Sequence, residues 1–230
     1  MQTMELTNKI KEKIKKHALK NIKEESCGLI LSNSSVIECK NRASDNDVHF
    51  IIAAGDIKKA QKKGDVTAVY HSHIPSDFEN DKLSDEDLVI SEYFNIKTIL
   101  YSITEDKFHE YTPTGKPMEY IGRPYIRNVL DEFVLIKDYY KKELNIEISN
   151  FSNRNAEYFL KDNEFTEVSN AKKHDVLIIK FNNDITKKQM TLYLGDNQLI
   201  IHPEFDLSKK TNYNYGLQKW TEKIFRHNKM

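Results

Sequence analysis

A cluster of prolines and glycines near the middle of the chain constrains the fold more than any other feature. Proline breaks helices and interrupts strands, and glycine weakens both. Within residues 113–124 these breakers are Pro113, Gly115, Pro117, Gly122 and Pro124. The chain has 230 residues, enough for two modest hydrophobic cores. We therefore predict a first domain at 1–112, a linker at 113–124 and a second domain at 125–230.

Charge and cysteine content exclude several classes of protein. Lys plus Arg and Asp plus Glu both total 35, so no net charge favours nonspecific binding of nucleic acid. Cys27 and Cys39 are too few for a disulfide framework, which indicates folding in a reducing cytoplasm. No apolar run is long enough to span a bilayer, and the N-terminus lacks the continuous apolar region of a signal peptide. We expect no membrane insertion.

Apolar periodicity predicts an α/β sandwich in the first half. Apolar residues recur every four positions in residues 5–22, which favours a helix with one buried face. A second helix is expected at 56–63, ending at Gly64, and a third beginning at Ser84. Short apolar runs predict strands at 27–31, 48–52, 66–70, 98–103 and 107–111.

The second half has a different pattern and predicts an α+β domain. Residues 131–144 and 155–163 have helical periodicity, and the first of these segments is rich in aromatic side chains. Strands are expected at 176–181, 190–194 and 198–202.

A pair of histidines near the end of a predicted strand suggests a metal site. His71 and His73 are separated by one residue, so both side chains point to the same face of the strand. A catalytic zinc ion needs three protein ligands and an open position, and Asp87 in the first turn of the next helix can supply the third. Two histidines alone are more often a core or surface pair than a metal site.

Further residues in the expected order strengthen the zinc interpretation. Ser84 and Asp87 form a Ser-x-x-Asp pattern, and Glu25 lies three residues before Gly28 at a helix-to-strand junction. Together with His-x-His, this pattern resembles the JAMM (MPN+) metallopeptidase family over the first half of the chain. The resemblance implies that His71, His73 and Asp87 bind Zn²⁺, that Glu25 takes the proton from zinc-bound water, and that Ser84 stabilises the oxyanion.

The acidic metal ligand and the general base each have an alternative candidate. The segment between His73 and Asp87 is longer than usual for that family, so Asp85 is the alternative ligand, although Asp85 also suits the positive N-terminus of the helix. Glu24 is the alternative base. We favour Asp87 and Glu25 because these two keep the family spacing.

The second half extends the resemblance to nearly the full chain. Residues 122–125, 131–133 and 138–140, followed by 175–178 and 192–196, resemble the second domain of the phage tail-tip assembly protein K family. That family joins a JAMM domain to an NlpC-type cysteine peptidase domain. The implied fold is an α/β MPN (JAMM) domain followed by an α+β NlpC-like papain-fold domain.

The catalytic residues of that second domain are not present. Glu132 stands where the resemblance places a cysteine, Gln189 stands near the histidine position, and His202 is the remaining polar residue of the set. A carboxylate and an amide cannot perform thiol-based acyl transfer. The resemblance thus implies a degenerate, inactive second domain.

The expected function combines these two halves. We expect a zinc-dependent peptidase that acts on a tail precursor or a peptidoglycan peptide, with other tail-tip proteins as partners. The expected location is the host cytoplasm during assembly, and the sequence leaves open whether the protein stays in the virion tail tip afterwards. The alternatives are a structural tail-tip component with a vestigial metal site, or a module that binds the cell wall.

Overall fold

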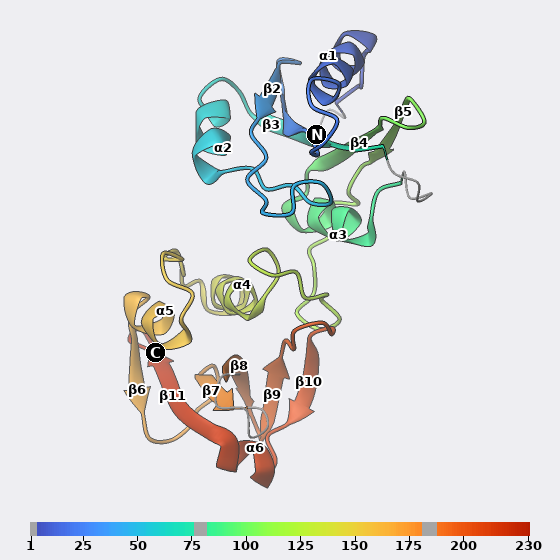
Figure 1. The fold of residues 1–230 in the computed structure, drawn as a ribbon. Coiled ribbons are helices and arrows are strands. Elements are labelled where there is room, and N and C mark those ends of the chain that lie inside the picture. Colours follow the sequence, from blue (N-terminus) through green and yellow to red (C-terminus); the bar gives the residue numbers. More distant parts are fainter. Residues whose placement is uncertain (1–3, 76–81, 181–187) are drawn as a thin grey trace. The chain divides into compact units, whose positions relative to one another are not determined.

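The computed structural model describes residues 4–75, 82–180 and 188–230. The chain divides into two compact units, Met1–Pro117 and Met118–Met230 (Figure 1). This division lies inside the 113–124 segment in which prolines and glycines cluster. The end of the strand expected at 176–181, Phe181, lies outside the described residues.

The first unit is a five-stranded mixed sheet with helices on both faces. The sheet has the strand order β2-β1-β3-β4-β5, and only β3 and β4 are parallel. Its strands are β1 (Cys27–Leu31), β2 (Val36–Cys39), β3 (Val66–His73), β4 (Lys97–Ser102) and β5 (Lys107–Tyr111). Its helices are α1 (Asn8–Ala18), α2 (Ala54–Gln61) and α3 (Asp85–Phe94).

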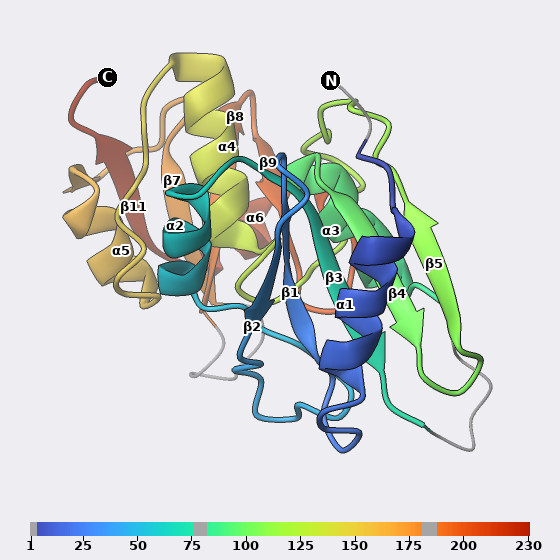
Figure 2. The same cartoon turned by 90° about the horizontal axis from the view of Figure 1, so that it is seen from above.

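Each face of this sheet has its own hydrophobic core. Helix α1 covers one face, where buried Ile10 and Ile14 pack with Ile30 and Tyr70 (Figure 2). Helix α2 covers the opposite face, where Ala60 packs with Leu29 and other strand residues. Side chains alternate between the two faces along a strand, so His71 and His73 both lie on the face opposite to that of Tyr70.

The first helix and one strand of this unit differ from the sequence prediction. Helix α1 ends at Ala18, before Ile22, which is 51% exposed although it continues the four-residue spacing. The strand expected at 48–52 does not form. Val48 and Ile51 are exposed, and of this segment only Ile52 makes an isolated bridge, with Asn41. The second strand is Val36–Cys39 instead, paired with β1.

The second unit is a six-stranded antiparallel sheet with the order β10-β9-β8-β7-β11-β6. Its strands are β6 (Phe165–Val168), β7 (Val176–Lys180), β8 (Lys188–Gly195), β9 (Gln198–Ile201), β10 (Lys209–Asn212) and β11 (Thr221–His227). Its helices are α4 (Glu132–Leu144), α5 (Ala156–Asp162) and α6 (Tyr215–Trp220). Strands β6, β10 and β11 and helix α6 were not expected from the sequence.

Apolar helix faces form the main core of the second unit. Residues of α4 and α5, such as Tyr140 and Phe159, pack on one face of the sheet against Ile178 and Phe225. The other face packs against α6 through Leu217. In the described part of the chain, no helix combines the length and apolar character needed to cross a bilayer.

Candidate metal centre

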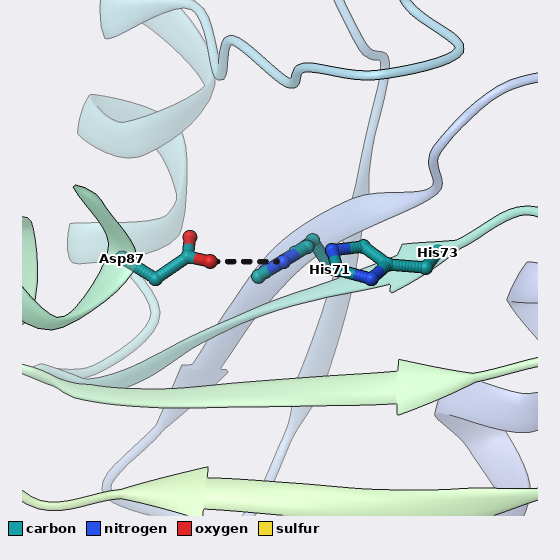
Figure 3. A group of neighbouring side chains, drawn as sticks. All are labelled: His71, His73 and Asp87. Carbon is teal, nitrogen blue, oxygen red and sulfur yellow. Dashed lines mark ion pairs between the residues drawn. The ribbon is translucent and has the colours of Figure 1, made fainter. Parts of the chain in front are cut away.

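Three side chains with metal-binding atoms meet on the α2 and α3 face of the first sheet. One ligand atom each from His71, His73 and Asp87 lies within 4.8 Å of the others (Figure 3). The Asp87 Oδ2 atom is 3.7 Å from His71 Nε2. Ligand atoms at about 2.1 Å from a tetrahedral zinc ion lie about 3.4 Å apart, so a small contraction would complete the site.

Close packing between β1 and β3 places the histidines. Cys27 of β1 lies opposite His71 of β3, and Gly28 lies opposite Tyr70. A Cβ atom on Gly28 would be 2.3 Å from the Ile37 carbonyl oxygen and 2.5 Å from the Tyr70 ring. The glycine of the Glu-x-x-Gly pattern is therefore required by the close approach of three strands.

Two serines join the start of β1 to the end of β3. The hydroxyl groups of Ser26 and Ser72 are 2.9 Å apart, and Ser26 N–H donates to Ser72 Oγ at 3.0 Å. The Ser72 N–H donates to the Ser26 carbonyl oxygen at 2.9 Å. Both side chains are buried, so these bonds hold Glu25 beside the two histidines.

Helix α3 presents Asp87 through a capping box. Asp87 N–H donates to Ser84 Oγ at 3.1 Å, and Ser84 N–H donates back to Asp87 Oδ2 at 2.9 Å. The Ser84 hydroxyl also donates to Asp87 Oδ2 at 2.7 Å. Asp87 is 9% exposed and faces His71, whereas Asp85 is exposed to solvent. In this arrangement the Ser84 hydroxyl orients Asp87, and it could stabilise an oxyanion only after releasing its bond to that carboxylate.

Burial keeps His71 in the form that can bind a metal. His71 is 1% exposed, and its ring stacks on Phe50 with ring centroids 4.6 Å apart. Burial lowers the pKa of His71 to about 4, against the opposing effect of the Asp87 carboxylate. The ring is thus neutral at pH 7, and its Nδ1 atom has no hydrogen-bond partner among the described residues.

Glu25 lies next to the triad and is an almost fully buried carboxylate. It is 4% exposed, and its Oε1 atom is 3.8 Å from His73 Nε2. Burial, followed by the charges of Asp87 and Asp47, raises the pKa of Glu25 to about 8. Glu24 points elsewhere and accepts a hydrogen bond from Asn46 Nδ2 at 2.8 Å.

Sequence reasoning missed the loop that completes this site. Buried Asn41 anchors the loop: its amide donates to the Glu25 carbonyl oxygen at 3.1 Å and to the His49 carbonyl oxygen at 2.8 Å. The Asn41 Oδ1 atom also accepts from Ile51 N–H at 3.1 Å. The loop thereby holds Phe50 against His71. An isolated asparagine and phenylalanine give no sequence signal for such a role.

In the second unit, the structure places Glu132 and Gln189 around one cavity. Glu132 is the first residue of α4, and Tyr125 Oη donates to its Oε2 atom at 3.3 Å. Gln189 Nε2 donates to the backbone carbonyl of His202, and the His202 ring packs edge-on against Tyr125. The buried His202 ring does not line the cavity, and burial lowers the pKa of His202.

Comparison with known proteins gives a distant relative. The chain is 23% identical over 225 residues to the tail tip assembly protein K of Escherichia phage N15, and the match covers 92% of this chain and 91% of that protein. No protein-family model matches the sequence. The similarity extends across both compact units and supports a relation to a phage tail-assembly family.

Proposed function

We propose that this chain is a phage tail-assembly protein whose first unit is a zinc-dependent amide hydrolase of the JAMM type. The observation that carries the hydrolase is the meeting of a neutral, buried His71 with His73 and Asp87, beside the buried carboxylate of Glu25. The assembly role rests on the similarity to the tail tip assembly protein. Other tail proteins are the expected partners.

The donor set suits zinc. Two imidazole nitrogens and one carboxylate oxygen are common ligands of catalytic zinc, which keeps a fourth position open. When bound, zinc would acidify water and polarise the amide carbonyl of a substrate. A neutral His71 offers its lone pair without first losing a proton, because burial has already lowered its pKa.

The remaining residues would position ligands and move protons. Glu25 would accept a proton from the attacking water and return it to the leaving amine, a role for which a pKa near the working pH is favourable. Ser84 would hold Asp87 in its ligand orientation through the capping box. Ser26 and Ser72 would keep Glu25 at a fixed distance from His73.

We also propose that the second unit does not act as a thiol peptidase. Both cysteines of the chain are in the first unit, and Glu132 begins helix α4 where a thiol nucleophile would be needed. The amide of Gln189 is bonded to the His202 backbone and cannot act as a general base. This unit would therefore serve in binding or assembly.

Zinc content and cleavage assays test the hydrolase proposal together. The full chain is dialysed against a buffer that contains zinc, and its metal content is measured. It is then incubated with purified tail proteins and, separately, with cell-wall peptides. We expect about one equivalent of zinc and cleavage products in one of the two substrate sets. Absence of bound zinc between pH 6 and 8 would refute the metal site.

One variant separates hydrolysis from metal binding. Glu25→Gln should keep zinc and lose cleavage, because an amide cannot accept the proton. Asp85→Asn, an exposed carboxylate on α3, is the matched control and should change neither quantity. A chain that binds zinc but cleaves no substrate in either set would instead support a structural metal site.

A further inference from the structure

The cavity in the second unit has the size of a ligand site. Its volume is about 740 Å³, within the usual range for small-molecule pockets. It is bordered by the start of α4, the start of β8 and the loop after β9, through residues that include Tyr125, Glu132, Phe133, Gln189, Glu204 and Phe205. The cavity is distinct in sequence from the metal centre, because all these residues belong to the second unit.

Several charges around the cavity are engaged with a neighbour. Arg154 forms an ion pair with Asp131, and its other nitrogen donates to the Asn128 carbonyl oxygen. Lys209 Nζ is 2.6 Å from Asp206, and Lys188 Nζ is 2.7 Å from Glu222, a carboxylate that it shares with Lys180. Arg127 is exposed, so solvent screens its charge.

Glu132 is a half-buried carboxylate that lines the cavity and takes part in none of these pairs. Among the described residues, no lysine, arginine or histidine nitrogen lies within ion-pair distance of Glu132. Its direct partner is the Tyr125 hydroxyl at 3.3 Å, a neutral donor. The N-terminus of α4 contributes only about half a positive charge. A cation from a ligand would favour the charged form of this half-buried carboxylate.

The walls of the cavity determine which cation suits it. Tyr125 and Phe133 supply aromatic surface, against which an alkyl chain can pack, and Phe205, which is 93% exposed, also borders the cavity. Glu204 also lines the cavity and is exposed, so it adds a solvent-screened negative charge. We propose that this cavity binds the aliphatic ammonium group of a lysine side chain in a peptide, with the half-buried Glu132 as the acceptor.

Two small probes test the site in the full chain. Nα-acetyl-lysine N-methylamide carries the ammonium group, and its Nε-acetylated form has nearly the same shape without the charge. Ligand-observed NMR titrations should give saturable binding of the first probe and at least about tenfold weaker binding of the second, the usual loss for a hydrogen bond to a charged group. Equal binding of both probes, or binding of neither, would overturn the proposal.

Variants locate the acceptor. Glu132→Gln should weaken binding of the charged probe by at least about tenfold, whereas Glu204→Gln should weaken it by about two- to fivefold because an exposed charge is screened. Asp162→Asn, an exposed carboxylate that does not line the cavity, is the matched control and should leave binding unchanged. Wild-type affinity in Glu132→Gln would refute the assignment of the acceptor.

The wild-type protein gives an independent test if Glu132→Gln fails to fold. Burial raises the pKa of Glu132 to about 7, with Asp131 raising it further and Tyr125 and Arg154 opposing. The probe ammonium keeps its charge between pH 6 and 8. Its affinity should therefore fall about tenfold from pH 8 to pH 6 as Glu132 takes up a proton. An affinity that is constant over this interval would contradict the proposal.

Discussion

Glu25, the carboxylate proposed as general base, should destabilise the metal-free first unit at neutral pH. Glu25 has a pKa of about 8 in the folded protein and an ordinary value of 4.5. The folded chain therefore binds more protons at this residue than the unfolded chain between pH 4.5 and 8. Stability is lost as pH rises through this window, because unfolding then releases a proton.

The size of this effect follows from the two pKa values. Each unit of pKa difference is worth about 1.4 kcal/mol. Removing the ionisable group in Glu25→Gln should raise the free energy of unfolding by about 1 kcal/mol at pH 5 and by about 3 kcal/mol at pH 7. The lowered pKa of His71 gives a slope of opposite sign between pH 4 and 6.5, but that slope is common to both proteins and cancels in the difference.

The chain contains separate probes for its two units. Cys27 and Cys39 are buried in the first unit, so labelling of their thiols in urea reports its unfolding. Trp220, the single tryptophan, reports the second unit by fluorescence. With a chelator present, Glu25→Gln should move the thiol-labelling transition to higher urea, increasingly so from pH 5 to 7, and leave the Trp220 transition in place.

The outcome of this experiment can refute the reasoning in two ways. A stability difference that does not change with pH would mean that Glu25 ionises normally and that its burial does not raise its pKa. Saturating zinc should shrink the difference at pH 7, because a nearby cation favours the carboxylate. A difference that zinc leaves unchanged would show that no metal binds beside Glu25.

Three further predictions concern the same site. Replacing His71 or His73 by Ala should abolish stoichiometric zinc binding, as measured by metal analysis, because too few ligands remain. Asp87→Asn should weaken zinc binding by at least about tenfold, whereas Asp85→Asn should leave zinc affinity within about twofold; the reverse order would show that Asp85 is the ligand. Gly28→Ala should lower the free energy of unfolding by about 3 kcal/mol through overpacking, as read by thiol labelling in urea.

Local signals allowed much of the first unit to be predicted. Ser84 and the acidic residues after it mark a helix start, and α3 begins there with the capping box that this pattern favours. The alternation of β3 places His71 and His73 on one face, as the spacing indicates. These features depend on residues that are close together in the sequence, so they can be recognised from a single sequence.

Elements whose burial depends on distant partners were predicted less well. Residues 48–52 are apolar enough for a strand, yet the loop is held by the Asn41 side chain and leaves Val48 exposed. In the second unit, β11 has charged residues among its apolar ones, but β6 and β7 pair with it on both sides. Pairing across such sequence distances overrides local propensity.

The chemistry of the site is set by neighbours that no spacing rule identifies. Glu25 is distinguished from Glu24 by family spacing in the sequence, but its raised pKa comes from burial and from the charges of Asp87 and Asp47. The motif also gives Ser84 an oxyanion role, whereas the fold engages its hydroxyl with Asp87. A motif therefore names the groups that can react, and the packing around β3 determines their protonation and which of their hydrogen bonds are already made.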